Sequence, residues 1–366
     1  MKTGLTLPAA YFTSEEIYAE EREKIFGTSW FYIGRANRLA QPGDFFLAEV
    51  ADESLIVTVG DDGQARAFFN VCRHRGTRLC AEPGGQFEHG KIRCPYHQWT
   101  YDCQGSLVAA PRMDEGRSFN RSEWSLLRAG LAEWEGFLFV NLAPEPEPIT
   151  DSFAPHWNRL RTWRVSELQT AHRETYELKT NWKLIFHNFN ECYHCLSIHP
   201  GLNDRSPVRS GTNDFIEGRF LGGPMNLTAE SMTMSGARCA PLIRDLADDD
   251  HRRVYYYTLM PNMLLALHPD FVVAWQLQPT APGRTTIHCD WLFEPETIAQ
   301  PDFDPSDGVE FWDQTNRQDW EVCQRSYVGV RSRAYSPGPW APNEVIPQAF
   351  DQELLRSMGH EQELPL

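Results

Sequence analysis

The sequence predicts an α+β protein in which a small antiparallel β domain precedes a larger domain of mixed helices and strands. Three features lead to this prediction. Short strand-like runs separated by Gly, Pro and Asp turns fill residues 30–142. A stiff segment in which Pro and Glu alternate, residues 143–148, ends that region. One long helical pattern, residues 306–332, follows near the C-terminal end.

A helix is predicted near the N-terminus, at residues 14–28. Ser14 is suited to cap this helix because its hydroxyl can accept a backbone N–H, and acidic residues follow in the first turn. Apolar residues at helical spacing provide a buried side. We therefore expect residues 1–36 to form an N-terminal helical segment that packs on the larger domain.

The β domain is expected at residues 37–146, and the larger domain at residues 147–366. Apolar or alternating runs typical of strands occur at 45–50, 54–59, 67–71 and 136–142. Beyond the linker, helical and strand-like segments mix without an internal repeat.

The composition is that of a globular protein with an acidic surface. The chain has 366 residues, 41% of them hydrophobic, and a formal net charge of −16. This charge argues against a nucleic-acid partner, because phosphate binding depends on Lys and Arg. No apolar stretch is long enough for a signal peptide or a membrane span, so we expect a cytoplasmic protein without membrane association. Its nine cysteines are then expected in metal sites or in the core rather than in disulfides.

Two short segments of the β domain each offer one thiolate and one imidazole. They are Cys72-Arg-His74 and Cys94-Pro-Tyr-His97. A zinc finger usually groups its cysteines in one pair and its histidines in another. In a cluster of two irons and two sulfides, one iron can take both cysteines and the other both histidines, so each segment supplies one of each. The order therefore favours a [2Fe–2S] cluster held by Cys72, His74, Cys94 and His97 over a zinc knuckle or unrelated core residues.

A second group of possible metal ligands lies in Glu191-Cys-Tyr-His194-Cys-Leu-Ser-Ile-His199-Pro200. Two histidines and one carboxylate bind one face of a non-haem Fe(II) and leave the opposite positions open. Residues five apart are separated by roughly 140° around a regular helix, so both histidines cannot face one metal from it. Since the residue before a proline avoids the α conformation, we expect His199 at or past a helix end. A di-iron site needs a second Glu-x-x-His copy, which the sequence lacks.

The missing carboxylate is expected on the helix at residues 306–332. Its inner stripe is mostly apolar but contains Asp319. A buried carboxylate needs a partner, and a metal ion can be that partner. Asp313 and Glu310 are the alternative ligands on the same helix, although both could simply be acidic residues on its solvent-exposed face.

The two Cys–His segments carry a clear resemblance to a known family. Cys72-Arg-His-Arg-Gly-Thr-Arg78 and Cys94-Pro-Tyr-His-Gln-Trp-Thr-Tyr101 resemble the motifs of the Rieske non-haem iron oxygenases. The extra cysteines of respiratory Rieske proteins are missing, which favours the oxygenase branch. Gln98 stands where the family commonly has glycine; this alters the loop but removes no ligand.

The larger domain resembles one branch of this family, which includes glycine betaine, choline and carnitine oxygenases. The similar segments are Asn188-Phe-Asn-Glu-Cys-Tyr-His-Cys195, His268-Pro-Asp270 and Asn316-Arg-Gln-Asp-Trp320. The last of them is similar to the family segment that contributes the aspartate ligand. The resemblance implies a catalytic domain of helix-grip (START-like) fold, with a curved antiparallel sheet and a long C-terminal helix.

The resemblance also implies an electron path between subunits. Family members form a ring, usually a homotrimer, in which the cluster of one protomer lies close to the mononuclear iron of the next. An acidic residue bridges the two, which places Glu191 beside His97 of the next chain; a helix-surface acid is its alternative role. A separate flavin and iron–sulfur reductase passes electrons from NADH or NADPH through the cluster to the Fe(II), where O2 is cleaved. The sequence has no Gly-x-Gly-x-x-Gly motif after a strand, so the electron source is another protein.

The substrate that the resemblance implies is a small methylated amine, such as a betaine, which the enzyme hydroxylates or N-demethylates. Aromatic side chains bind such cations. The candidates for substrate binding are Trp275 and Tyr257, followed by Tyr255, Tyr256 and Trp291, although strand aromatics often serve only the core.

Two other functions remain open from the sequence. One is ring hydroxylation or O-demethylation of an aromatic carboxylate, whose acid group an arginine such as Arg205, Arg209 or Arg219 would hold. The other is a redox module that carries a cluster but performs no turnover. The intact set of His194, His199 and Asp319 argues against this second function.

Overall fold

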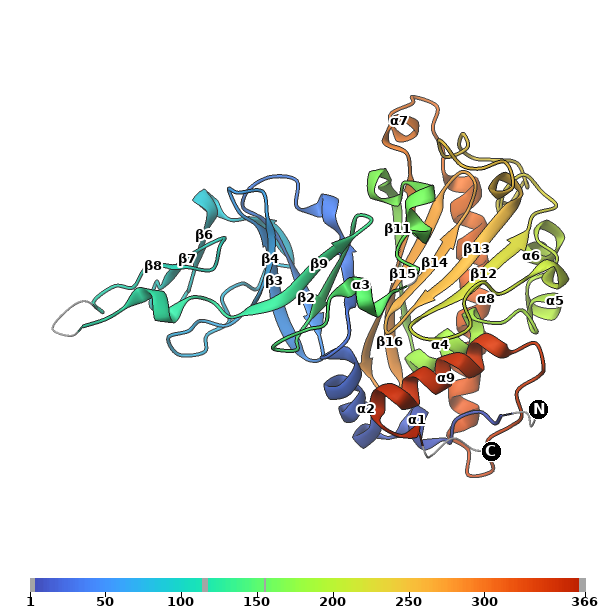
Figure 1. Ribbon diagram of the computed structural model, residues 1–366, viewed down its shortest axis with the longest axis horizontal. Coiled ribbons are helices and arrows are strands. Elements are labelled where there is room, and N and C mark those ends of the chain that lie inside the picture. Colours follow the sequence, from blue (N-terminus) through green and yellow to red (C-terminus); the bar gives the residue numbers. More distant parts are fainter. Residues whose placement is uncertain (1–3, 114–117, 155, 362–366) are drawn as a thin grey trace. The chain divides into compact units, whose positions relative to one another are not determined.

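The computed structural model describes residues 4–113, 118–154 and 156–361 (Figure 1). The chain forms two compact units: Phe26–Ile149 make up a β unit, and the residues up to Ile25 and from Thr150 onward make up a larger unit. The N-terminal segment of the larger unit is thus shorter than the expected 1–36. The reason is that β1 (Phe31–Arg35) pairs with β10 (Phe137–Asn141) and so belongs to the β unit.

The β unit contains one large and one small antiparallel sheet. The large sheet has seven strands in the order β1-β10-β9-β4-β3-β2-β5, and the small sheet has the order β6-β7-β8. The four strands expected from the sequence are confirmed as β2, β3, β4 and β10. The remaining bounds are β2 Asp44–Val50, β3 Glu53–Val59, β4 Ala65–Phe69, β5 Gly84–Gln86, β6 Lys91–Arg93, β7 Thr100–Asp102, β8 Leu107–Ala109 and β9 Arg128–Trp134.

The larger unit is built on a six-stranded antiparallel sheet in the order β11-β16-β15-β14-β13-β12. Figure 1 shows that this sheet is curved and that the long helix α8 (Ser306–Val330) runs along it. The predicted α+β class, with a curved antiparallel sheet and a long C-terminal helix, is confirmed. The strand bounds are β11 Gln169–Leu178, β12 Phe220–Asn226, β13 Arg253–Leu259, β14 Met263–Leu267, β15 Val272–Ala281 and β16 Arg284–Phe293.

Helices α1 and α4 of the larger unit contact α8. Helix α8 contacts α4 and strand β11, and α9 contacts α4 and β12. No helix of the described residues is long and apolar enough to cross a bilayer. The helix bounds are α1 Ala10–Thr13, α2 Glu15–Glu21, α3 Ile149–Ser152, α4 Trp182–Phe189, α5 Cys195–Ile198, α6 Pro200–Arg205, α7 Pro295–Ile298 and α9 Val345–Met358.

The helix starts follow from local hydrogen bonds. The Ser14 hydroxyl accepts the backbone N–H groups of Glu16 and Ile17 at 3.1 and 3.2 Å, which confirms Ser14 as the cap of α2. Asp304 accepts the backbone N–H of Ser306 at 2.9 Å and so starts α8. The helical segment predicted at 14–28 is confirmed over most of its length but is not a single α-helix, because α2 ends at Glu21 and a π-helical turn, Arg22–Phe26, follows it directly.

A buried ion pair attaches α2 to α4. The Lys183 ammonium donates to one carboxylate oxygen of Glu21, and the indole N–H of Trp182 donates to the other at 2.8 Å. Both charged side chains are fully buried. The N-terminal helices therefore pack on the larger unit through a specific polar contact as well as through apolar side chains.

Candidate metal centres

Three side chains from two distant parts of the larger unit meet at one point. His194 and His199 come from the segment around α5, and Asp319 comes from the middle of α8. Ligand atoms of the three side chains all lie within 4.8 Å of one another. The Nε2 atoms of His194 and His199 lie 3.2 and 2.7 Å from the same oxygen, Oδ1 of Asp319. Within the described ranges 4–113, 118–154 and 156–361, this is the only such group of three.

The backbone around Pro200 explains how two histidines five residues apart can converge. Helix α4 ends at Phe189, and a turn leads to the short helix α5. His199 follows α5 with φ −124° and ψ 66°, outside the α region, and Pro200 is the first residue of α6. The expectation that His199 leaves the helix is therefore confirmed, although the segment forms two short helices rather than one long one.

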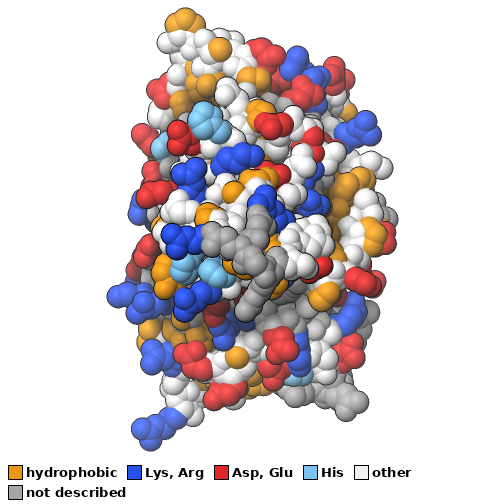
Figure 2. All heavy atoms as spheres, turned by 90° about the vertical axis from the view of Figure 1, so that its left-hand side faces the viewer, with side chains coloured by type: hydrophobic (Ala, Val, Ile, Leu, Met, Phe, Trp, Pro, Cys, Tyr) orange, Lys and Arg blue, Asp and Glu red, His pale blue; other side chains and the backbone are white. Residues whose placement is uncertain are grey.

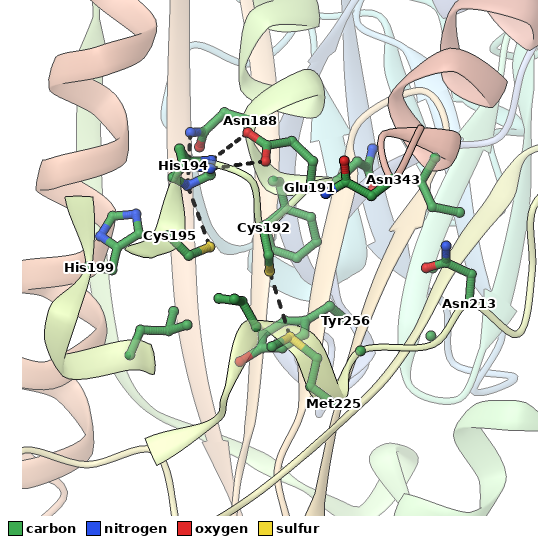
Figure 3. Close-up of a pocket in the computed structure, with 18 of the residues that line it drawn as sticks. Asn188, Glu191, Cys192, His194, Cys195, His199, Asn213, Met225, Tyr256 and Asn343 are labelled. Carbon is green, nitrogen blue, oxygen red and sulfur yellow. Dashed lines mark hydrogen bonds and ion pairs between the residues drawn. The ribbon is translucent and has the colours of Figure 1, made fainter. Parts of the chain in front are cut away.

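Glu191 lies in the turn between α4 and α5, not on a helix surface. Its Oε1 accepts a hydrogen bond from Nδ1 of His194 at 2.5 Å. Its Oε2 accepts the backbone N–H groups of Tyr193 and His194. Figure 3 shows His194 linked in this way to Glu191, with His199 nearby on the same side of the pocket. The carboxylate thus holds the His194 ring with its Nε2 directed at Asp319.

The electrostatics of the group favour a bound cation. Burial opposes a charge on His194, but the hydrogen bonds to Asp319 and Glu191 outweigh it and raise the pKa of His194 to about 10. Burial also opposes the charge of Asp319, yet its bonds to the two histidines lower the pKa of that carboxyl. Two carboxylates that stabilise a proton here would also stabilise a metal ion. Two imidazole nitrogens and one carboxylate oxygen are the donor set of a non-haem Fe(II) site.

The other acidic candidates lie elsewhere. Asp313 accepts a hydrogen bond from the Tyr176 hydroxyl at 2.8 Å and pairs with Arg317, so its oxygens face away from the two histidines. Glu310 is exposed on α8. The carboxylate at 319 is therefore the one that the fold brings to His194 and His199.

In the β unit, the two Cys–His segments form two facing loops. Cys72 and Cys94 are 2% and 1% exposed and belong to one apolar cluster with Trp99. The rings of His74 and His97 meet edge to face with centroids 4.7 Å apart, and His74 stacks on Trp99. The two cysteines therefore lie together in the core of the β unit, and the two histidines lie together nearer its surface. A cluster in which one iron is bound by two cysteines and the other by two histidines requires this arrangement.

The two loops share the same backbone turn. The N–H of Gly76 donates to the carbonyl of Cys72 at 3.0 Å, and the N–H of Gln98 donates to the carbonyl of Cys94 at 3.2 Å. Gly76 has φ +73° and Gln98 has φ +62°. Both positions therefore require the left-handed conformation, which suits glycine and strains Gln98.

The histidine side of this group is suited to a metal and to electron exchange. Nδ1 of His74 is buried and has no hydrogen-bond partner among the described residues, an arrangement that a metal ligand would satisfy. Arg73 and Arg75 flank His74, and their guanidinium groups lie over the rings of Trp124 and Tyr96. His74 and His97 are partly exposed, whereas Cys72 and Cys94 are buried. The face drawn in Figure 2 carries histidine side chains among Lys and Arg side chains. Electrons therefore have a shorter path to the surface through the histidines than through the buried cysteines.

A cavity of about 200 Å³ lies beside the His194, His199 and Asp319 group. Three aromatic residues, Phe189, Tyr256 and Trp312, line it. Asparagine and threonine side chains and the carboxylates of Glu191 and Asp319 supply its polar groups, and no Lys or Arg of the described chain lines it. The other lining residues are Asn188, Asn190, Cys192, His194, Cys195, His199, Leu202, Val208, Gly211, Thr212, Asn213, Gly222, Gly223, Pro224, Met225, Thr315, Asn343 and Ile346.

Neither Trp275 nor Tyr257 lines this cavity. Successive side chains of a strand point to opposite faces, so Tyr256 of β13 reaches the cavity while Tyr257 packs against Phe220 on the other face. Trp275 lies behind the cavity wall, 5.5 Å from the ring of Trp312, and its indole N–H donates to Asn316. Strand periodicity alone could not select the face, because both faces of β13 carry aromatic residues.

Sequence reasoning also missed two residues of the site. Gln318 accepts a hydrogen bond from Nδ1 of His199 at 2.7 Å. Trp312, on the same stripe of α8 as Asp319, faces the cavity. Trp312 could have been found, because it lies on the same mostly apolar face of the helix as Asp319. No sequence pattern distinguishes Gln318 from other glutamines on a helix surface.

Comparison with known families supports two domains. Residues 29–126 match the Rieske [2Fe-2S] domain, and residues 165–360 match the ring hydroxylating alpha subunit (catalytic domain). The chain is 28% identical to the glycine betaine monooxygenase oxygenase subunit of Chromohalobacter salexigens, over 92% of this chain and 82% of that one. It is 36% identical to the carnitine monooxygenase oxygenase subunit of Acinetobacter baumannii, over 56% of this chain and 55% of that one.

Solved structures show the same fold. A quaternary ammonium Rieske monooxygenase superposes with a TM-score of 0.83 at 25% identity, over 98% of this chain and 96% of that one. Naphthalene 1,2-dioxygenase from a Rhodococcus species superposes with a TM-score of 0.79 at 20% identity, over 96% and 94%. The chain therefore belongs to the ring-hydroxylating alpha subunit family, as an oxygenase subunit of the Rieske type whose cofactors are a [2Fe–2S] cluster and a mononuclear non-haem iron.

Proposed function

We propose that this oxygenase acts on a small methylated amine and that the two groups described above hold its metals. Cys72 and Cys94 would ligate one iron of the cluster, and His74 and His97 the other. His194, His199 and Asp319 would ligate the mononuclear iron. When bound, that iron supplies the reductive activation of O2 that inserts an oxygen atom into a C–H bond.

The observation that carries the substrate proposal is the aromatic wall of the cavity. The Tyr256 ring lies 6.1 Å from Phe189 and 6.0 Å from Trp312, and both pairs meet edge to face. Such a group of rings attracts a quaternary or tertiary ammonium by cation–π interaction. The lining does not repel a cation, because the carboxylates of Glu191 and Asp319 lie in it and no Lys or Arg of the described residues does. Relatives named as glycine betaine and carnitine monooxygenase subunits support the same substrate class.

The positions of the arginines weigh against an aromatic carboxylate. Arg205 donates to the backbone carbonyls of Gly201, Thr233 and Met234. Arg219 pairs with the buried carboxylate of Glu353. Neither these two arginines nor Arg209 lines the cavity. The arginine expected to hold the acid group of an aromatic carboxylate is therefore not found in this cavity, where a substrate carboxylate would have only amide and hydroxyl donors.

The residues of the cavity would act by orientation and by exclusion of water. The aromatic wall holds the ammonium so that one N-methyl group faces His194, His199 and Asp319. Hydroxylation of that methyl gives an N-hydroxymethyl group, which releases formaldehyde and leaves the amine with one methyl fewer. The full reaction consumes one O2, two electrons and two protons and also yields water.

The electrons would come from a separate flavin and iron–sulfur reductase and cross between chains of a homotrimer. We place Glu191 as the bridge, hydrogen-bonded to His97 of a second copy. One contact supports this role: Glu191 already accepts a hydrogen bond from His194, so a further bond to His97 would join the two metal sites directly. A hydrogen-bonded carboxylate between two ligating imidazoles orients both and couples their charges.

The test is NAD(P)H- and O2-dependent turnover with a surrogate reductase. The panel pairs glycine betaine, carnitine and choline with benzoate and methoxybenzoate, and formaldehyde is measured for each. Formaldehyde from an ammonium compound, in step with O2 uptake, is the expected result. Oxidation of the benzoates alone would refute the substrate proposal and favour the aromatic-acid function.

A further inference from the structure

Two consecutive residues of α8 engage both ring nitrogens of His199. Nδ1 of His199 lies 2.7 Å from Oε1 of Gln318, and Nε2 lies 2.7 Å from Oδ1 of Asp319. Consecutive helix residues point about 100° apart, so the two side chains reach the imidazole from different directions. Gln318 and Asp319 together fix the orientation of the His199 ring.

His199 needs such support because no helix orients it. It stands between α5 and α6 with non-helical dihedral angles, while its ring is only 2% exposed. His194, by contrast, is held by Glu191 from within its own turn. The two histidines therefore have different partners at Nδ1: a carboxylate for His194 and a neutral amide for His199.

The chemistry of the amide determines which nitrogen of His199 is free. A neutral imidazole carries one N–H, and the Gln318 carbonyl oxygen can only accept that hydrogen. When a metal ion takes the Nε2 position, the remaining hydrogen therefore sits on Nδ1, where it is donated to Gln318, and the lone pair of Nε2 is free for the metal. We propose that Gln318 is a positioning residue that fixes the tautomer and the orientation of His199 for the mononuclear metal. This inference rests on the proposed ligand role of His199 and adds a residue that touches no metal itself.

A second cavity makes this hydrogen bond vulnerable to water. A space of about 120 Å³ borders His199 on the Gln318 side, with Gly201, Arg205 and Gln314 among its lining residues. Gln318 forms part of the wall of that space. If an apolar side chain replaced Gln318, water from this space would compete for Nδ1, and the ring would lose its fixed orientation.

The test is Fe(II) affinity, measured by equilibrium dialysis and metal analysis on protein whose [2Fe–2S] cluster is intact by its visible spectrum. Gln318→Leu removes the acceptor and should weaken Fe(II) binding about 10–100-fold. Gln318→Glu keeps an acceptor for the same N–H and should bind Fe(II) at least as tightly as the unmodified protein. Gln314→Leu, one turn earlier on α8 and facing the same cavity, is the matched control and should bind Fe(II) normally.

Equal Fe(II) affinity in Gln318→Leu and the unmodified protein would overturn the inference while leaving the ligand proposal intact. An equal loss of Fe(II) affinity in Gln314→Leu would also overturn the inference. The loss would then follow from any apolar substitution in the wall of this cavity and not from the hydrogen bond to His199. If the unmodified protein binds no Fe(II) beyond its cluster, the ligand proposal fails first. Should Gln318→Leu not fold, Gln318→Asn replaces it; its amide is too short to reach His199, so it is expected to show the same weakening.

Discussion

Oδ1 of Asp319 lies 2.7 Å from Nε2 of His199, although 120 positions separate the two residues in the chain. The contact joins the middle of α8 to the residue between α5 and α6, so the fold assembles the metal site only when α8 packs against that segment. Both elements belong to the larger unit, so this site does not depend on the β unit for its ligands. The β unit contributes the second metal group and, on our proposal, the electrons.

The first prediction concerns the aromatic wall. Tyr256→Ala should raise the KM for an ammonium substrate about 2–30-fold, since a cation–π contact contributes about 0.5–2 kcal/mol. Tyr256→Phe keeps the ring and removes a buried hydroxyl that has no partner among the described residues, so it should retain most of the affinity. Steady-state kinetics with the best substrate of the panel checks both. Equal KM values for the Ala and Phe variants would argue against a cation–π role.

The second prediction concerns the bridge. Glu191→Gln can still accept the N–H of His194, so both metals should stay bound. The loss of its charge should slow electron transfer from the cluster about 10–100-fold. Stopped-flow decay of the reduced-cluster spectrum, in the presence of substrate and O2, measures this rate. An unchanged rate with both metals present would remove Glu191 from the electron path.

The third prediction concerns the strained loop at Gln98. Because Gln98 has φ +62°, Gln98→Gly should stabilise the cluster-binding loop by about 0.5–1 kcal/mol. The matched change is Gly76→Ala in the other loop, where φ is +73° and an added Cβ meets no atom within 4 Å. It should destabilise by a similar amount through the backbone alone. The temperature at which the cluster absorbance bleaches should rise for the first variant and fall for the second; shifts in the same direction would contradict this reading.

The fourth prediction concerns the buried pair between α2 and α4. Burial lowers the pKa of Lys183, and Glu21 opposes that effect. Glu21→Gln leaves a buried ammonium without its counter-charge and should cost about 3–5 kcal/mol of unfolding free energy. Glu321→Gln, which breaks an exposed pair with Arg325 on α8, should cost no more than about 1 kcal/mol.

Urea unfolding of these variants tests the difference, with the double variant Glu21→Leu, Lys183→Met as a further control. The double variant should recover only part of the loss: it contains no buried charge, but the indole N–H of Trp182 loses the acceptor that Glu21 provided. Similar losses for the buried and the exposed pair would show that the contact between α2 and α4 depends on packing alone.

Much of the fold could be predicted because local signals were strong. The α8 helix began where Asp304 and Ser306 indicated, and its mostly apolar stripe pointed Asp319 inward. Pro200 similarly predicted that His199 would leave its helix. These features depend on residues close together in the chain, whose conformational preferences are visible in the sequence.

The cavity wall could not be predicted for a physical reason. All five residues of β14 are buried, and β13 carries aromatic residues on both faces. The alternation of side chains along these strands therefore does not show which face of the sheet borders the cavity. Whether Tyr256 or Tyr257 reaches the cavity depends on the register between β13 and its neighbours, which is a tertiary property. The role of Gln318 likewise appears only when α8 meets the loop at His199.

The central claim is that a metal held by His194, His199 and Asp319 oxidises a methylated amine. The most direct measurement compares Asp319→Ala with Asp313→Ala for iron content and for formaldehyde released from the ammonium substrate. Asp313 lies on the same helix but is engaged by Tyr176 and Arg317, outside the cavity. We predict that Asp319→Ala keeps the visible spectrum of the cluster, loses the third iron and forms no formaldehyde, while Asp313→Ala retains the spectrum, the third iron and formaldehyde formation. Formaldehyde formation by Asp319→Ala at the normal rate would contradict it.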